Sequence, residues 1–203
     1  AHGLCCSQIW EHKGNPAGQR LTANRTIESF YKWSGGGRIP IFCDTTSCTH
    51  TLLFETGGDI LTPENREKYK QLKIMDITQW LKEVVLPRIK VIRPKNRILL
   101  HPTCSCQIMG LTPVLLDIAR KCAREVILPD NWGCCGASGD RGFIFPELSD
   151  SATRDERDEI GHESFDGCYS LARTCEIAMQ DHIEQPYESI VYLVDETIQD
   201  QGT

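Results

Sequence analysis

The chain has 203 residues, of which 40% are hydrophobic and 25% are charged, as in ordinary globular proteins. Its formal net charge of −6 argues against a nucleic-acid-binding surface, because phosphate recognition needs clustered lysine and arginine. No stretch approaches the roughly 18 apolar residues that span a bilayer, and the first residues do not resemble a signal peptide. We therefore expect a cytoplasmic protein with no transmembrane segment and no nucleic-acid partner.

Sequence periodicity predicts alternating strands and helices. In chain order, these are a strand at 38–42, helices at 65–71 and 77–85, a strand at 97–100, a helix at 112–123, a strand at 125–128, and helices at 149–160, 175–183 and 187–198. Asp76 and Ser149 are the expected N-caps of two of these helices, and residues 189–194 could instead form a strand. The strand–helix–strand unit at 97–128 indicates a parallel sheet, and hence an α/β fold.

Cysteine is the unusual residue of the chain, with 11 copies. A protein of this length does not need disulfides to compensate for a small core, and the number is odd. Cysteine clusters in such chains more often bind metal or carry out redox chemistry. Because the pair Cys5-Cys6 lies so near the first residue, we also expect the sequence to be a fragment of a longer protein.

Two stretches of the sequence resemble each other, which predicts an internal repeat. The matching positions are Cys5-Cys6 with Cys134-Cys135, Lys13 with Arg141, and Cys48 with Cys175, at offsets of 129, 128 and 127 residues. We expect two pseudo-repeated half-domains, 1–95 and 96–203, each with a short parallel sheet flanked by helices. Cys104 has no counterpart in the first half, which is therefore expected to be truncated at its N-terminus.

The adjacent cysteines point to an iron–sulfur cluster. A disulfide between neighbouring residues is strained, and the pairs lack the Cys-x-x-Cys spacing of tetrahedral zinc sites. A cluster presents several irons, so consecutive thiolates could reach it. Cys43, Cys104 and Cys134-Cys135 also follow predicted strands, and open α/β sheets place their sites at the carboxyl ends of strands.

Other residues near the second cysteine pair have candidate roles. Gly136 allows the backbone to approach a cofactor closely, His101 could hydrogen-bond to the site, and Arg141 could offset the negative charge of a cluster; a structural or solvent-exposed role is open for each. Four further cysteines have favoured roles in packing or as buried thiols: Cys43, Cys106, Cys122 and Cys168.

The cysteine motifs resemble the CCG domain of heterodisulfide reductase B subunits and glycolate oxidase iron–sulfur subunits. They are also similar to the C-terminal region of bacterial FAD-linked D-lactate and D-2-hydroxyglutarate dehydrogenases that carry a fused iron–sulfur module. The segments that carry the resemblance are 3–6, 40–49, 101–104, 134–143 and 173–177. The chain departs from the family pattern at Ser7, where glycine is usual, and at Thr45 and Ala172, where cysteine is usual.

The resemblance implies an iron–sulfur electron-transfer domain with a 4Fe–4S cluster. The implied ligands are Cys104, Cys134, Cys135 and Cys175 in the second half and Cys5, Cys6 and Cys48 in the first. Electrons would pass from the flavin of a 2-hydroxyacid dehydrogenase to a quinone or another acceptor. FAD and a ferredoxin-like domain are expected upstream in the parent protein, which could be peripheral at the inner face of the membrane.

Two other functions remain open at this point. The domain could use a cluster and its thiols for thiol–disulfide catalysis, as in heterodisulfide reductase, or the cysteines could form a structural zinc module. No Gly-x-Gly-x-x-Gly fingerprint occurs in the chain, so we do not expect the chain alone to bind FAD or to oxidise a substrate.

Overall fold

The computed structural model describes residues 3–200. The chain forms two compact units that divide between Ile77 and Thr78. The half-domains expected from the repeat divide instead between residues 95 and 96, so residues 78–95 pack with the second unit.

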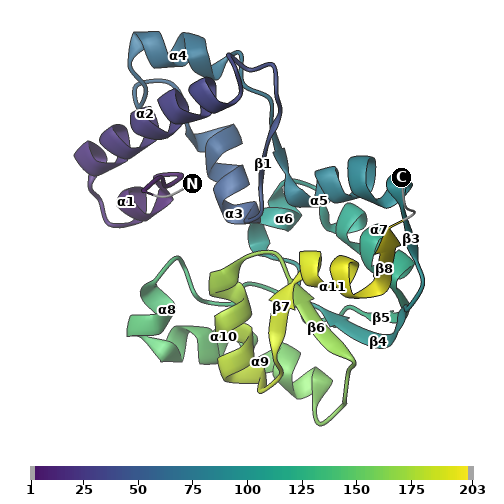
Figure 1. Cartoon of the computed structure of the whole chain (residues 1–203). Coiled ribbons are helices and arrows are strands. Elements are labelled where there is room, and N and C mark those ends of the chain that lie inside the picture. The colour runs from purple at the N-terminus through teal and green to yellow at the C-terminus, as the bar shows by residue number, and fades with distance from the viewer. Residues whose placement is uncertain (1–2, 201–203) are drawn as a thin grey trace. The chain divides into compact units, whose positions relative to one another are not determined.

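The first unit is mainly helical. Asn15 caps the long helix α2 (Pro16–Trp33), which packs against α4 (Pro63–Tyr69) around Ala23, Ile27 and Leu61 (Figure 1). The strands β1 (Ile41–Cys43) and β2 (Ile74–Asp76) pair in parallel. The remaining elements are α1 (Gln8–His12), α3 (Thr46–His50) and a π-helical turn, η1 (Thr51–Glu55).

The second unit is built on a parallel four-stranded sheet in the order β5-β4-β6-β7. Its strands are β4 (Lys95–Leu100), β5 (Ala123–Ile127), β6 (Gly167–Ser170) and β7 (Tyr187–Ser189). The helix α7 (Thr112–Cys122) connects β4 to β5, which confirms the predicted strand–helix–strand unit. The strand β6 has no counterpart among the predicted elements.

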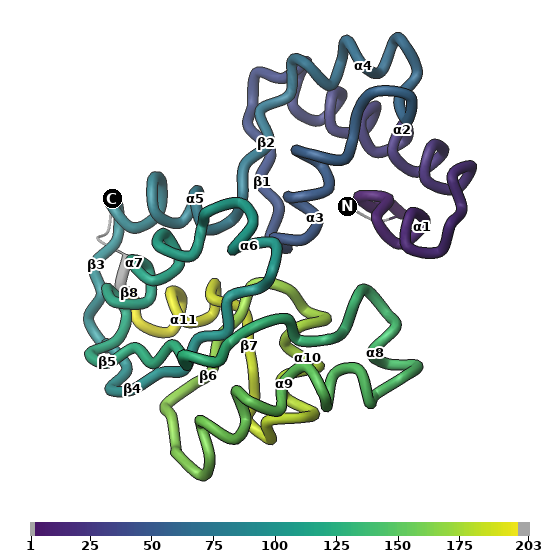
Figure 2. The backbone as a smooth tube through the Cα atoms, turned by 180° about the vertical axis from the view of Figure 1, so that it is seen from behind, coloured from purple at the N-terminus to yellow at the C-terminus, as the bar shows by residue number. Residues whose placement is uncertain are grey.

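Helices cover both faces of this sheet (Figures 1 and 2). The helices α7 and α11 (Ile190–Thr197) pack together on one face, and α9 (Pro146–Ile160) and α10 (Arg173–Ile183) pack together on the other. The chain leaves β4 toward β5 and returns on the other side of β4 to form β6. The order of strands therefore reverses at β4 and β6, and such a point is where open α/β sheets bind their ligands.

Short elements complete the second unit. They are α5 (Ile77–Trp80), which spans the division between the units, η2 (Leu81–Val85), η3 (Leu86–Arg88), α6 (Cys104–Ile108), α8 (Arg141–Ile144), and the antiparallel pair β3 (Ile89–Val91) and β8 (Ile198–Asp200). None of the helices within residues 3–200 is both long enough and apolar enough to cross a membrane.

Two predicted helices need correction. The helix expected from Ser149 begins at Pro146, because proline at the first helical position is already in the helical conformation; Ser149 is thus inside the helix and does not cap it. The helix expected at 187–198 is divided: residues 187–189 form β7 by pairing with β6, and α11 begins at Ile190. Asp76, the other expected cap, is the last residue of β2.

The fold class is confirmed as α/β, with short parallel sheets flanked by helices. The internal repeat is not confirmed, because the first unit has a two-stranded parallel sheet and the second a four-stranded one. One local order is nevertheless shared: a cysteine pair, a long helix, a strand, and a cysteine at the start of the next helix.

Candidate metal centre

The second unit brings four predicted ligands to one edge of its sheet. Cys104 begins α6 after β4, Cys134 and Cys135 lie in the loop after β5, and Cys175 is in the first turn of α10 after β6. Because these strands are parallel neighbours, their carboxyl ends lie at the same edge. The Sγ atoms of Cys135 and Cys175 are 2.9 Å apart, and Cys104 and Cys134 are within hydrogen-bonding reach of each other.

Hydrogen bonds among these thiols separate their pKa values. Bonds from Cys104 and Cys135 lower the pKa of Cys134 well below its ordinary value of 9.0. The bond to Cys134 raises the pKa of both Cys104 and Cys135, and burial raises them further. The thiols of the pair and of Cys104 thus differ in how easily they lose a proton, with Cys134 the most acidic of the three.

The turn after the cysteine pair depends on Gly136. Its φ of 72° lies in the left-handed region, and its backbone N–H donates to Cys134 Sγ at 3.4 Å. A Cβ at this position would lie 2.6 Å from the carbonyl oxygen of Leu148 at the start of α9. Only glycine satisfies both conditions, and the close backbone approach that the structure shows at Gly136 is to α9; its expected approach to a cofactor stays a prediction.

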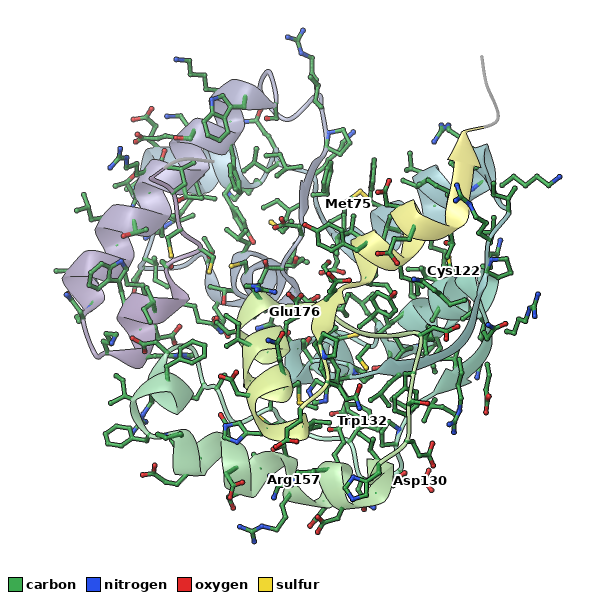
Figure 3. The ribbon with its side chains drawn as sticks, turned by 60° about the horizontal axis from the view of Figure 1, so that its bottom comes forward. Met75, Cys122, Asp130, Trp132, Arg157 and Glu176 are labelled. Atoms are coloured by element: carbon green, nitrogen blue, oxygen red, sulfur yellow. The ribbon has the colours of Figure 1, made fainter. Side chains whose placement is uncertain are left out.

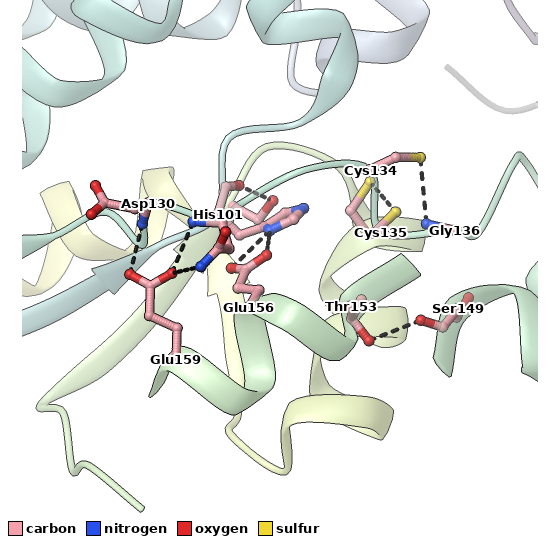
Figure 4. A network of polar contacts seen from close by, with 12 residues as sticks. His101, Asp130, Cys134, Cys135, Gly136, Ser149, Thr153, Glu156 and Glu159 are labelled. Atoms are coloured by element: carbon pink, nitrogen blue, oxygen red, sulfur yellow. Dashed lines mark hydrogen bonds and ion pairs between the residues drawn. The ribbon is translucent and has the colours of Figure 1, made fainter. Parts of the chain in front are cut away.

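His101 is held beside this turn by a buried carboxylate. The side chains of His101 and Glu156 are 1% and 2% exposed, and His101 Nδ1 lies 2.9 Å from Glu156 Oε2. Figure 4 shows the imidazole pointing from Glu156 toward the Cys134-Cys135 turn. The positive potential of His101 also contributes to the lowered pKa of Cys134. Within the described part of the chain, the buried Nε2 atom has no hydrogen-bond partner.

A second carboxylate fixes the loop that carries the pair. Glu159, on α9, accepts hydrogen bonds from the backbone N–H groups of Asp130 and Asn131 at 2.7 and 2.8 Å (Figure 4). These two bonds lower the pKa of Glu159. Arg141 begins α8, and its side chain is exposed to solvent.

The first unit brings together Cys5, Cys6 and Cys48. The thiol of Cys6 bonds to Cys48, which raises the pKa of Cys6 to about 11 and lowers that of Cys48. The turn has the same form as that in the second unit: the backbone N–H of Ser7 donates to Cys5 Sγ at 3.4 Å, and Ser7 has a φ of 82°. Serine thus adopts here the left-handed conformation that Gly136 has in the second unit.

Three of the four cysteines expected to pack are buried in the second unit, whereas Cys43 is half-buried in the first unit. Cys122 lies on α7 beside α11, where it hydrogen-bonds to Thr197 (Figure 3). Cys106 and Cys168 are also fully or almost fully buried. All 11 cysteines are free thiols, and among residues 3–200 no three His, Cys, Asp or Glu side chains have the geometry that would hold a single metal ion.

Sequence reasoning missed Glu156 and Glu159, which lie in the acidic run of α9. Glu156 shares helical spacing with Ser149, Thr153 and Ile160, and the structure buries all four. Because three of the four are polar, the spacing alone does not mark them as an inward-facing stripe; in the structure the buried carboxylate has its partner in His101. Nothing local to Glu159 indicated that its partners are backbone groups of a distant loop.

No model of a protein family matches the chain, and no curated protein matches it significantly.

Proposed function

We propose that this chain is an iron–sulfur electron-transfer domain of the CCG type. Its electrons would come from the flavin of an FAD-linked 2-hydroxyacid dehydrogenase and pass to a quinone or another acceptor. The observation that carries the proposal is the meeting of Cys104, Cys134, Cys135 and Cys175 at one sheet edge. The flavin partner and the acceptor rest on the family resemblance alone.

The residues at this edge fit a thiolate-ligated cluster. Four thiols are the usual ligand set of a 4Fe–4S cluster. The unpartnered Nε2 of His101, buried and pointing toward the cysteine turn, fits a group that exchanges a hydrogen bond with it. When bound, the cluster would accept and release single electrons.

The chain's own residues would prepare and shield this site. Gly136 lets the turn lie against α9, so that the two thiols of the pair face the other cysteines. Glu156 fixes the orientation of the His101 ring through Nδ1, as carboxylates do for histidines next to metal sites. Ala137, Leu99 and Met179 pack around Cys135 and Cys175 and keep water away from this side of the site.

Anaerobic reconstitution with ferrous iron and sulfide tests the proposal. We expect the wild-type protein to bind iron and sulfide in equal amounts and to give an EPR signal when reduced. Cys134→Ser should abolish the cluster of the second unit, whereas Cys122→Ser, a matched change of a buried thiol in the same unit, should retain it. A protein that binds one zinc ion and remains redox-silent would overturn the proposal in favour of a structural zinc module.

A second candidate function is thiol–disulfide chemistry, which the 2.9 Å separation of Cys135 and Cys175 favours. In that case the two thiols would lose two electrons and two protons to a disulfide substrate, which would be reduced to two thiols. Incubation of the iron-free protein with oxidised glutathione, followed by mass spectrometry, would then reveal a Cys135–Cys175 disulfide. If both thiols remain reduced, this second function is excluded.

A further inference from the structure

The first unit contains a pocket with an unusual lining. Its volume is about 360 Å³, and the side chains of four cysteines reach it: Cys5, Cys6, Cys43 and Cys48. Phe30, Trp33 and Phe42 form aromatic parts of its wall, and no lysine or arginine lies among the described residues that line it. The pocket thus presents four thiols in a mainly apolar lining that also contains Asp44, Thr26 and Thr45.

Cys43 belongs to this thiol cluster. It is the last residue of β1, and Cys48 lies in α3, the helix that follows that strand. Cys43 lies near enough to Cys6 and Cys48 for a charge on one thiol to raise the pKa of another, and the Cys43 thiol also hydrogen-bonds to Thr49. Burial, together with Asp44 and Asp76, raises the pKa of Cys43 to about 11, as expected for a thiol held in apolar surroundings near carboxylates.

The size of the pocket favours a group larger than one ion. A single zinc ion bound by four thiolates lies about 2.3 Å from each sulfur and needs almost no open space. A pocket of about 360 Å³ is in the range of sites that hold a small molecule or a polynuclear cofactor. Thiolates are soft ligands, and apolar walls that exclude water are typical of iron–sulfur sites.

From this arrangement we infer that Cys43 is a further ligand of the iron–sulfur group that the family resemblance implies for Cys5, Cys6 and Cys48. The kind of group rests on the proposed function, but the site is separate from that of the second unit. This role for Cys43 replaces the packing role that the sequence favoured, because Cys43 lines the same pocket as the other three cysteines.

Variants of each unit separate the two sites. After anaerobic reconstitution, Cys43→Ser and Cys5→Ser should each lower the iron content to roughly half that of the wild type, and the double variant should lose no more than either alone. Cys134→Ser should leave the iron of the first unit in place, and Cys122→Ser should change nothing. If Cys43→Ser retains the iron that Cys5→Ser loses, Cys43 is not a ligand.

Alkylation of the wild-type protein provides a second readout that does not depend on how the variants fold. Because the raised pKa of Cys43 slows its alkylation, iodoacetamide is used at alkaline pH, where it should label Cys43 in the iron-free protein and leave it unlabelled, together with Cys5, Cys6 and Cys48, after reconstitution. If Cys43 is labelled equally in both states while Cys134 becomes protected, the inference fails and the proposed function stands. If no cysteine becomes protected and no iron binds, both the inference about Cys43 and the proposed function fail.

Discussion

Each cysteine pair is followed by a residue with left-handed backbone, and the two units meet this requirement differently. Gly136 has no side chain and lies against the backbone of α9. Ser7 adopts the same conformation with a Cβ, which is energetically unfavourable for residues other than glycine. The shared hydrogen bond to the first cysteine, 3.4 Å in both turns, shows that the turn geometry itself is common to the two units.

Gly136→Ala should destabilise the second unit by roughly 2 kcal/mol or more, because the left-handed conformation and the contact with the Leu148 carbonyl both oppose a Cβ. Urea denaturation measures the loss. Gly133→Ala is the matched control, since its Cβ would meet nothing within 4 Å. Equal stability of the two variants would show that the turn tolerates a side chain.

At the scale of elements, buried polar pairs connect the strands to α9. His101 follows β4, and Glu156 belongs to the inward face of α9, so their contact joins the sheet to the helix that covers it. The pair is nearly inaccessible to water, and Ser170, the last residue of β6, donates a hydrogen bond to the His101 carbonyl oxygen at 2.8 Å. The ring position is therefore determined by two strands and a helix together.

Glu156→Ala should cost about 2–4 kcal/mol of unfolding free energy, because it leaves the buried Nδ1 of His101 without an acceptor. Glu156→Gln should cost less, since its amide oxygen can still accept that bond. Glu147→Gln, an exposed change on the same helix, is the control for the loss of charge. Thermal denaturation of the three variants tests the order; a Glu156→Ala protein as stable as the control contradicts it.

The loop that carries the second cysteine pair should loosen at acidic pH. Backbone hydrogen bonds lower the pKa of Glu159 below its ordinary value of 4.5. Its contribution is therefore complete above pH 4.5 and is lost as the pH falls through the lower folded-state value. Amide exchange of Asp130 and Asn131, measured on both sides of that value, should accelerate on acidification.

In Glu159→Gln this dependence should disappear, because glutamine does not titrate. Asp158→Asn, a change of the neighbouring exposed carboxylate, should keep the wild-type dependence. A wild-type loop whose exchange follows only the intrinsic chemical rate across this range would refute the role of Glu159.

At the scale of the whole molecule, two compact units each contain a group of cysteines. A ligand that binds only the folded state stabilises the part of the protein that holds it. Binding of a cluster at one group of cysteines should therefore slow amide exchange in the unit that contains them. The slowing should not extend beyond the division between residues 77 and 78.

Reconstitution of the Cys43→Ser protein should slow amide exchange in β4, β6 and α10, which surround the cysteines of the second unit, and leave α2 unchanged. In Cys134→Ser the pattern should be reversed, with slower exchange in α2 and β1. Hydrogen exchange with mass spectrometry resolves these segments. A uniform slowing over both units in either variant would contradict the division into separate sites.

Much of the second unit could be predicted from local sequence. The strands β4 and β5 and the helix α7 have clear periodicity, and a strand–helix–strand unit dictates a parallel sheet and a shared carboxyl edge. That edge, with Cys104 and the pair Cys134-Cys135, followed from the sequence. By contrast, β6 and β7 are only four and three residues long, too short to show a period, and they exist because each pairs with a neighbour already in place.

The sequence by itself determined the α/β class and which cysteines are candidate ligands, because these depend on residue type and local spacing. Only the tertiary structure decided which side chains meet. It placed Cys135 beside Cys175, gave His101 its buried partner Glu156, and brought Cys43 into the pocket of the first unit. These contacts join residues up to 55 positions apart, and such distances are closed by strand order and helix packing, which no local pattern encodes.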